Sequence, residues 1–304
     1  MSLSGKISTE LPVQATAEKW FHTVRNQLHH IQHVSGDVHG AGLDQGDDWR
    51  ANDSVKHWTY TVDGRVETCH ERIESVDEQK KRIAFKIFGE AIDAKYKVYK
   101  LIFEAIEKDD GSGAIKWSVE YEKVISHPSP HYLIPYLSYL FLQIFTMSLA
   151  GKLSTELPVH ATAEKWFHTY TNQLHHIQHV THKIHGAKLH QGDDWHANDS
   201  VKHWTYIVDG KTVTCHEAIE SVDEQKKRIV FKLYGEDVDN KYKVLKLIFE
   251  AIEKGDGSAA IKWSVEYEKV SEDVHPPYGY LEFCDHCIKD VDAYLIKAEE
   301  NANK

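Results

Sequence analysis

The second half of the chain alternates apolar and polar residues with a period of two. In residues 259–270, Ile261, Trp263, Val265 and Tyr267 alternate with lysine, serine and glutamate. This is the pattern of a β-strand that buries one face. Comparable runs lie at 151–159, 200–208, 211–223, 226–236 and 241–254.

The pair Asp209-Gly210 separates two of these runs and predicts a tight hairpin. Both central residues of a type I′ turn have a positive φ, which Asp-Gly accommodates well. We therefore expect the runs 200–208 and 211–223 to pair antiparallel.

Two segments near the start of this half predict short helices. Residues 161–173 place apolar side chains at spacings of three and four, and Thr162 precedes them as a helix cap. The next run, LHHIQHV at 174–180, predicts a second short helix or the turn into the next strand.

A long helix is expected at the C-terminal end. Residues 280–298 carry apolar side chains at spacings of three and four, with Asp285 and Asp292 among the polar positions expected mostly off the apolar face. The order of elements is strand, one or two helices, about six antiparallel strands and a long helix. This order predicts an α+β fold in which a curved sheet grips a helix.

The chain contains two copies of the same domain sequence. Residues 147–270 repeat residues 1–124 without a gap, and about four in five of the aligned positions are identical. A repeat of this length describes two whole domains and not a solenoid unit.

The two copies differ at their ends. The second continues into the predicted helix, whereas the first runs into residues 126–146, which contain three prolines and no Asp, Glu, Lys or Arg. We therefore expect a domain over 1–125 that lacks its C-terminal helix, an apolar junction over 126–146, and a complete domain over 147–304.

Composition and charge narrow the classes of function. No stretch reaches the roughly 18–20 apolar residues of a membrane span, the start has no signal-peptide pattern, and four cysteines are too few for a disulfide framework. We expect a cytoplasmic protein. The net charge of −11, from 36 basic and 47 acidic side chains, would repel nucleic acid. The oligomeric state is left open.

Six motifs follow one another in the second copy, and most of them also occur in the first. They are GKLSTELPVHATAEKWF (151–167), HHI (175–177), QGDDW (191–195), IESVDEQKKRIVFKLYGED (219–237), WSVEYEKVSEDV (263–274) and YLEFCDHCIKDVDAYL (280–295). Their order and spacing resemble the major latex protein branch of the Bet v 1/PR-10 superfamily, nearly end to end in each copy.

The resemblance implies a sheet of about seven strands around a long C-terminal helix, with short N-terminal helices. It also implies a hydrophobic cavity for a small apolar plant metabolite or lipid, a role in plant defence or stress, and no cofactor. One loop departs from the wider superfamily, whose glycine-rich loop is here GDDWRANDS (46–54) and GDDWHANDS (192–200). Three aspartates in each loop would repel a phosphate, so nuclease and nucleotide-binding roles are disfavoured.

The apolar faces of the predicted strands and of the last helix supply candidate cavity residues. Alternating aromatic residues can also simply fill a core, and both interpretations stay open. The candidates are Trp204, Tyr206, Phe231, Ile261, Trp263, Val265, Tyr267, Leu281, Phe283, Cys284, Ile288, Val291 and Leu295.

A cavity enzyme of the same fold is the alternative function. Some superfamily members are Pictet-Spengler-type cyclases, but their catalytic motif has no residue-by-residue match here. The carboxylates Glu217, Glu220 and Glu266 are expected on a solvated face, and no catalytic residue is assigned. A non-binding interaction scaffold with a filled core is a third hypothesis.

Two further patterns suggest sites without establishing them. His175, His179 and His182 have the spacing of metal ligands on a helix, but a polar helix face explains them as well, so no metal is assigned. Cys284 and Cys287 form a lone CxxC pair inside the predicted helix, and we expect core or half-exposed thiols.

The junction has two explanations. Residues 131–145 are apolar enough to require burial and could fill the place of the first copy's missing helix. Alternatively, two adjacent genes were joined in a gene model, which the second Met, the abrupt loss of similarity after Val124 and the absence of charge favour.

Overall fold

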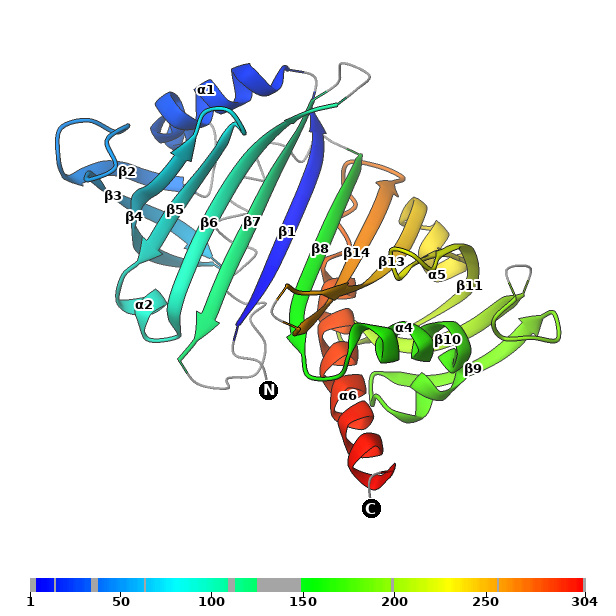
Figure 1. The fold of residues 1–304 in the computed structure, drawn as a ribbon. Coiled ribbons are helices and arrows are strands. Elements are labelled where there is room, and N and C mark those ends of the chain that lie inside the picture. The colour runs from blue at the N-terminus through cyan, green and yellow to red at the C-terminus, as the bar shows by residue number, and fades with distance from the viewer. Residues whose placement is uncertain are drawn as a thin grey trace. The chain divides into compact units, whose positions relative to one another are not determined.

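The structure of the chain is a computed structural model. It describes residues 4–13, 15–33, 38–62, 64–108, 113–124, 149–197, 200–255 and 257–302. The chain divides between residues 148 and 149 into two compact units, one for each copy. We call them the first unit and the second unit and describe each by itself (Figure 1).

The described residues of the second unit form a sheet of seven strands. Its strands lie in the order β8-β14-β13-β12-β11-β10-β9, and all neighbouring pairs are antiparallel. The strands are β8 (Ala150–Val159), β9 (Ile184–Gln191), β10 (Val201–Val208), β11 (Lys211–Asp223), β12 (Arg228–Tyr234), β13 (Tyr242–Glu253) and β14 (Ala259–Lys269). Its helices are α4 (Ala163–Asn172), the 3-10 helix η3 (Leu174–His179), α5 (Glu236–Asp239) and α6 (Tyr278–Ala302).

The hairpin predicted at Asp209-Gly210 is confirmed. The φ angles of the two residues are 52° and 71°, as a type I′ turn requires. Val208 pairs with Lys211, so the turn fixes the register in which β10 and β11 run together.

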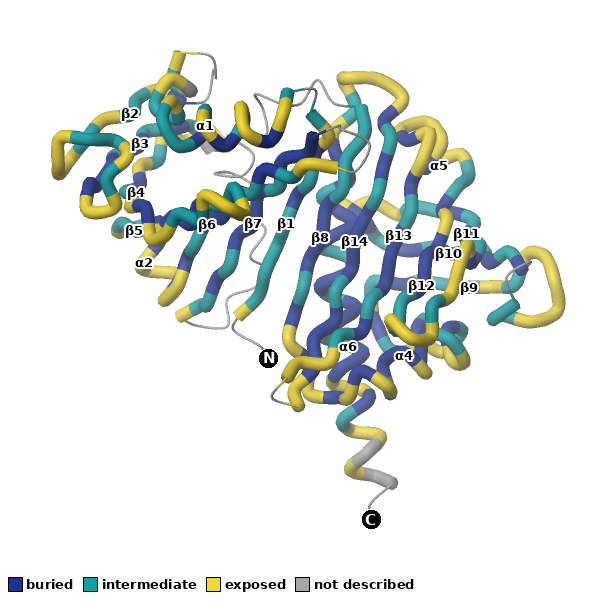
Figure 2. Tube along the Cα trace, turned by 45° about the horizontal axis from the view of Figure 1, so that its top comes forward, coloured by how far each residue is buried: buried dark blue, intermediate teal, exposed yellow. Residues whose placement is uncertain are grey.

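The alternating face of β14 is confirmed as a buried face. Ile261, Trp263, Val265 and Tyr267 are all 5% exposed or less. In Figure 2, β14 is mostly dark blue, the colour of buried residues. Burying four large apolar side chains from one strand contributes on the order of 6–12 kcal/mol before the entropy of folding is counted.

Helix α4 begins where the sequence predicts. The Thr162 hydroxyl accepts a hydrogen bond from the backbone N–H of Lys165 at 3.3 Å, which satisfies one of the free donors of the first turn. The helix packs on β13 and β14 and buries Trp166, Phe167 and Tyr170 against them.

Helix α6 covers the sheet and packs on β8, β14 and β10. The expectation that Asp285 and Asp292 lie away from its buried face is wrong, because they are 0% and 9% exposed. Asp285 accepts a hydrogen bond from the Thr155 hydroxyl at 2.6 Å. Asp292 accepts two from the backbone N–H groups of His160 and Ala161. Buried carboxylates with such partners anchor the helix to β8 and to the turn after it.

The first unit repeats this sheet, in the order β2-β3-β4-β5-β6-β7-β1, again antiparallel throughout. The strands are β1 (Ser4–Val13), β2 (Val38–Gln45), β3 (Val55–Val62), β4 (Arg65–Asp77), β5 (Arg82–Phe88), β6 (Tyr96–Glu107) and β7 (Gly113–Lys123). The helices described in it are α1 (Ala17–Gln27), the 3-10 helix η1 (Leu28–His33) and α2 (Glu90–Asp93).

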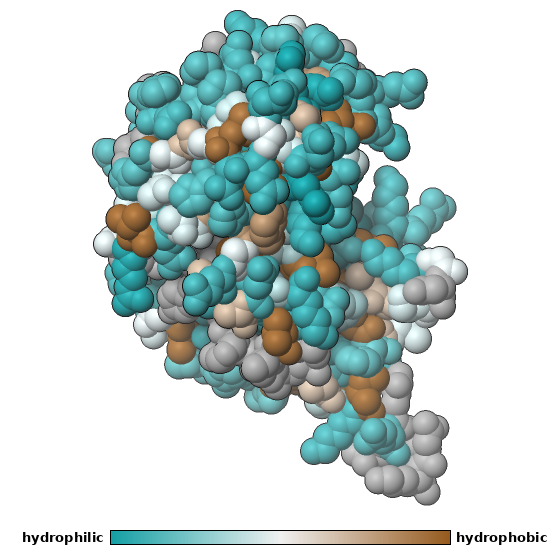
Figure 3. Space-filling view, turned by 90° about the vertical axis from the view of Figure 1, so that its left-hand side faces the viewer, coloured by the Kyte–Doolittle hydropathy of each residue, from teal (hydrophilic) through white to brown (hydrophobic). Residues whose placement is uncertain are grey.

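The face seen in Figure 3 is mostly hydrophilic, with apolar side chains in small separate groups.

The predicted α+β class is confirmed: the described residues of each unit form seven antiparallel strands and short N-terminal helices, and those of the second also form its long C-terminal helix. Strand β7 is the last element described in the first unit. The predicted lack of a C-terminal helix there, and the junction at 126–146, lie outside the described residues.

Candidate functional site

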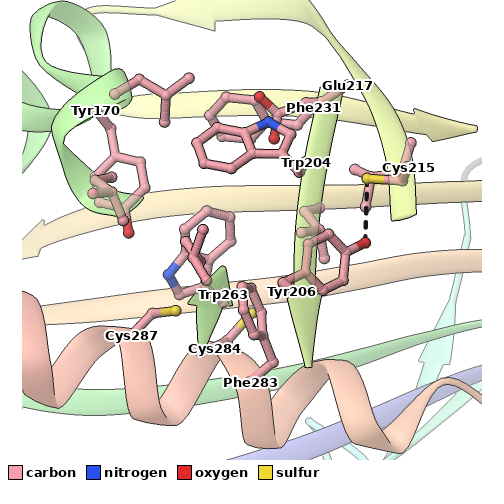
Figure 4. Close-up of a pocket in the computed structure, with 15 residues that line it drawn as sticks. Tyr170, Trp204, Tyr206, Cys215, Glu217, Phe231, Trp263, Phe283, Cys284 and Cys287 are labelled. Atoms are coloured by element: carbon pink, nitrogen blue, oxygen red, sulfur yellow. Dashed lines mark hydrogen bonds between the residues drawn. The ribbon is translucent and has the colours of Figure 1, made fainter. Parts of the chain in front are cut away.

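A cavity lies inside the second unit, between its sheet, α6 and the segment that contains α4 and η3. The space free of atoms there is about 540 Å³, a volume that includes solvent at the open side of the cavity. Its walls are almost entirely aromatic and aliphatic (Figure 4). The lining residues are Tyr170, Leu174, Ile177, Ile184, Trp204, Tyr206, Cys215, Glu217, Phe231, Leu233, Leu247, Trp263, Phe283, Cys284 and Cys287.

Aromatic rings from different elements meet around this cavity. Trp263 of β14 lies 5.4 Å from Tyr170 of α4 and 6.0 Å from Phe231 of β12, measured between ring centroids. Phe283 of α6 lies 5.0 Å from Tyr206 of β10. These separations are typical of favourable aromatic pairs, so the rings hold one another in place around the space.

The hairpin of β10 and β11 supplies the polar part of the wall. Lys202 faces Glu217 across the hairpin, and the next inward pair is Trp204 with Cys215. Lys202 is 0% exposed and Glu217 is 9% exposed. Burial raises the pKa of Glu217 to about 7, against the opposing effects of the Lys202 charge and the Trp204 indole N–H.

The hydroxyl of Tyr206 joins two other groups at the far end of this wall. Its oxygen lies 3.3 Å from the Cys215 sulfur and 3.3 Å from the Tyr280 hydroxyl oxygen. Burial raises the pKa of Cys215 to about 12 and that of Tyr206 well above its usual range. These groups therefore stay protonated and neutral at physiological pH.

The candidate residues divide into two groups by position. Six of them line the cavity: Trp204, Tyr206, Phe231, Trp263, Phe283 and Cys284. The other seven are buried without lining it: Ile261, Val265, Tyr267, Leu281, Ile288, Val291 and Leu295. Residues of the second group lie on β14 and α6, which also carry Trp263, Phe283 and Cys284 of the first group.

Nine lining residues were not among the candidates. Several of them could have been predicted from the sequence. Tyr170 and Leu174 continue the apolar spacing of 161–173, and Cys215 faces Trp204 in the predicted hairpin. Glu217 is a correction, since it is buried and not on a solvated face. Glu220 and Glu266 are as expected, because they form ion pairs with Lys246 at 2.7 Å and Lys152 at 3.0 Å at the surface.

The first unit has a smaller pocket of about 230 Å³ near the corresponding hairpin. Lys56 faces Glu71 in the same register as the pair of the second unit. Burial raises the pKa of Glu71 to about 7, with Lys56 and Trp58 opposing it. The pocket is lined by Val24, Arg25, Asn26, Leu28, His29, Trp49, Lys56, Glu71, Ile73 and Phe85.

The remaining candidate chemistry involves cysteine and histidine. Cys284 and Cys287 are both buried and reduced, and burial raises the pKa of Cys287 to about 12. Within the described ranges, no three His, Cys, Asp or Glu side chains converge on a point that would suit a metal ion. The helices described there also include none long and apolar enough to cross a membrane.

Comparison with known proteins identifies the family. The model of the pathogenesis-related protein Bet v 1 family matches residues 2–144 and again 148–298. MLP-like protein 28 of Arabidopsis thaliana is 32% identical over 98% of this chain and 94% of its own length. MLP-like protein 34 of the same plant is 30% identical over 98% of both chains, so both relatives match across the two copies.

A solved structure matches a single copy. The ginseng major latex-like protein 151 is 28% identical, covers 48% of this chain and 98% of its own, and superposes with a TM-score of 0.46. The repeated family match and the two relatives that span the whole chain lead to one conclusion. The chain belongs to the Bet v 1 family, as a tandem duplicate of its major latex protein branch.

Proposed function

We propose that the chain binds a small hydrophobic ligand in the cavity of the second unit and acts as a non-catalytic carrier or sequestering protein. The observation that supports this most strongly is the cavity wall itself. Fourteen of its fifteen lining residues are aliphatic, aromatic or thiol-bearing, and the remaining one is Glu217. A concave, mostly apolar space with a few polar groups is the usual form of a small-molecule site.

The setting we propose for this activity is the cytoplasm of a plant cell, in defence or stress responses. Two observations are compatible with it: the relatives named above are plant proteins, and the four cysteines of the chain are free thiols. Free thiols fit a reducing compartment.

A cavity enzyme of the same fold is the second candidate. It would need a group able to exchange protons with a substrate at neutral pH, and Glu217, with its pKa of about 7, is such a group. The tyrosine and cysteine side chains beside it stay neutral at that pH, so they supply neither a base nor a thiolate nucleophile. We therefore favour binding over catalysis.

We also propose the boundaries of the two domains in the tandem chain. The first covers residues 1–125 and the second covers 147–304, and residues 126–146 join them. The match of two relatives over nearly their whole lengths favours a tandem protein over a fusion of two adjacent genes. Sequencing transcripts across codons 120–150 tests this, and separate messages for the two halves would contradict it.

Titration of the full chain with the neutral fluorescent probe N-phenyl-1-naphthylamine tests ligand binding. Cys284 is 1% exposed and faces the cavity, so Cys284→Trp fills the space that a ligand would occupy. Val222 lies 39% exposed on β11, so Val222→Trp adds the same side chain at the surface.

We expect saturable fluorescence with the original chain and with Val222→Trp, and a loss of at least tenfold in affinity with Cys284→Trp. Equal affinity in all three proteins would show that the probe binds elsewhere. No saturable binding to the original chain would contradict the proposed function.

A further inference from the structure

The buried polar wall of the cavity contains an acceptor and a donor that face each other without completing a hydrogen bond. Glu217 Oε1 and Trp204 Nε1 are both buried, and neither has a hydrogen-bond partner within the usual limits of distance and angle, although the Trp204 N–H lies close enough to lower the pKa of Glu217. The two side chains lie together on the cavity wall in Figure 4. A buried polar atom without a partner costs about 1–3 kcal/mol.

The stability of the fold does not explain why Lys202 and Glu217 are buried beside Trp204. Lys202 and Glu217 face each other in the sheet, and both are more than nine-tenths buried. Apolar residues of the same size often stabilise a fold as well as, or better than, a buried ion pair. The same lysine and glutamate recur in the first unit as Lys56 and Glu71, in the same register.

The two unpaired atoms define the chemistry of a group that would complete them. When Glu217 is ionised its Oε1 accepts a hydrogen bond, and Trp204 Nε1 donates one. A hydroxyl group both donates and accepts, so one hydroxyl oxygen can satisfy both atoms. A carbonyl or an ether only accepts, an ammonium group only donates, and the charge of Lys202 further disfavours a cation.

We propose that Glu217 and Trp204 form a hydroxyl-binding subsite in the cavity, so that its ligand is an apolar molecule carrying an alcohol or phenol group. This inference rests on the proposed ligand-binding function and specifies its ligand class. The aromatic wall takes the body of the ligand, and the subsite fixes its orientation by the single polar group. The charge of Lys202 on the neighbouring strand favours the ionised form of Glu217, and Lys202 does not itself line the cavity.

Matched probes test the subsite in the full chain. The probes are 2-naphthol, 2-methoxynaphthalene and 2-naphthylmethylamine, with affinities measured by isothermal titration calorimetry at about pH 8, above the pKa of Glu217. A hydrogen bond to a charged acceptor is expected to make 2-naphthol bind about tenfold to a hundredfold more tightly than 2-methoxynaphthalene. The variants are Glu217→Gln, which removes the charge at equal size, and Trp204→Phe, which removes the donor and leaves Glu217 in place. Glu71→Gln is the matched control in the first unit.

Each variant should reduce the ratio of the affinities for 2-naphthol and 2-methoxynaphthalene several-fold, whereas Glu71→Gln should leave that ratio unchanged. If Glu217→Gln does not fold, Trp204→Phe provides the same comparison. Equal binding of the two neutral probes by the original chain would overturn the subsite and leave the ligand-binding function standing. Tighter binding of the amine would assign the subsite to a cation and overturn the inference. If none of the probes binds, both proposals fail.

Discussion

Asp292 offers a direct test of how α6 is held on the sheet of the second unit. Its carboxylate accepts hydrogen bonds from the backbone N–H groups of His160 and Ala161 at 3.1 and 3.0 Å. It also lies 2.8 Å from the His160 ring nitrogen Nδ1. The Asp292 side chain is 12% exposed, so water replaces these bonds poorly after Asp292→Ala.

The size of the effect follows from these contacts. Each of the two backbone hydrogen bonds to the carboxylate contributes about 1.5–3 kcal/mol. The His160 side chain is 69% exposed, so its contact adds less than about 1 kcal/mol. Asp292→Ala is therefore expected to lower the free energy of releasing α6 by about 3–6 kcal/mol.

Hydrogen exchange of the full chain, followed by mass spectrometry, measures this release locally in peptides from residues 278–302. A loss of about 3 kcal/mol corresponds to exchange on the order of 100-fold faster. Asp290→Ala is the control on the same helix, because Asp290 is 30% exposed and only approaches the exposed His182 at 3.4 Å. Its exchange should change less than about fivefold. Equal exchange in the two variants would refute the anchoring role of Asp292.

Three further predictions concern charge, thiols and independence of the units. Burial raises the pKa of Glu217 from 4.5 to about 7, so the folded state holds this proton more tightly than the unfolded chain. The unfolding free energy should therefore fall by about 3 kcal/mol through this residue between pH 4.5 and pH 7. Glu217→Gln should flatten that part of a urea denaturation series, and an unchanged pH dependence would contradict the assignment. Cys284 and Cys287 should react with a thiol reagent only as the protein unfolds, because both are buried and burial raises their pKa values. Rapid labelling of either thiol in the native protein would contradict this prediction. Residues 147–304 should fold alone, whereas 1–125 alone should aggregate, and cooperative thermal unfolding of the shorter fragment would refute that expectation.

Local patterns in the sequence were sufficient to predict most of the fold. The Asp209-Gly210 turn fixes its own φ angles and the register of its hairpin, and the alternation around Trp263 fixes which face of β14 is buried. These features depend on neighbours in sequence and on the geometry of a single element. The class of fold followed from their order along the chain.

The polar groups of the interior could not be predicted in the same way. Glu217 lies on the same face of its strand as Cys215 and Ile219 because of its two-residue spacing. Its charge nevertheless predicted a side chain that is exposed to solvent. Asp285 and Asp292 were likewise placed mostly off the buried face of their helix. Each of these buried side chains lies beside a polar group on another element. Lys202 on β10 faces Glu217, and Thr155 on β8 donates a hydrogen bond to Asp285. Such partners are known only once the sheet and the helix have come together.

The division of the candidate residues has a similar cause. Trp263 and Ile261 alternate on the same face of β14, yet only Trp263 lines the cavity. Whether an inward side chain meets empty space or another side chain depends on where α6 crosses the sheet. The packing of side chains between elements decides this, and periodicity within one strand does not report it.

Native mass spectrometry of the full chain, purified from its own tissue, shows directly whether the cavity of the second unit holds a small apolar molecule. We expect a chain with one additional small mass that is released on activation, and no such mass in Cys284→Trp expressed in the same tissue. A chain found only at the mass of its own sequence, under conditions that preserve non-covalent complexes, would rule out a bound ligand.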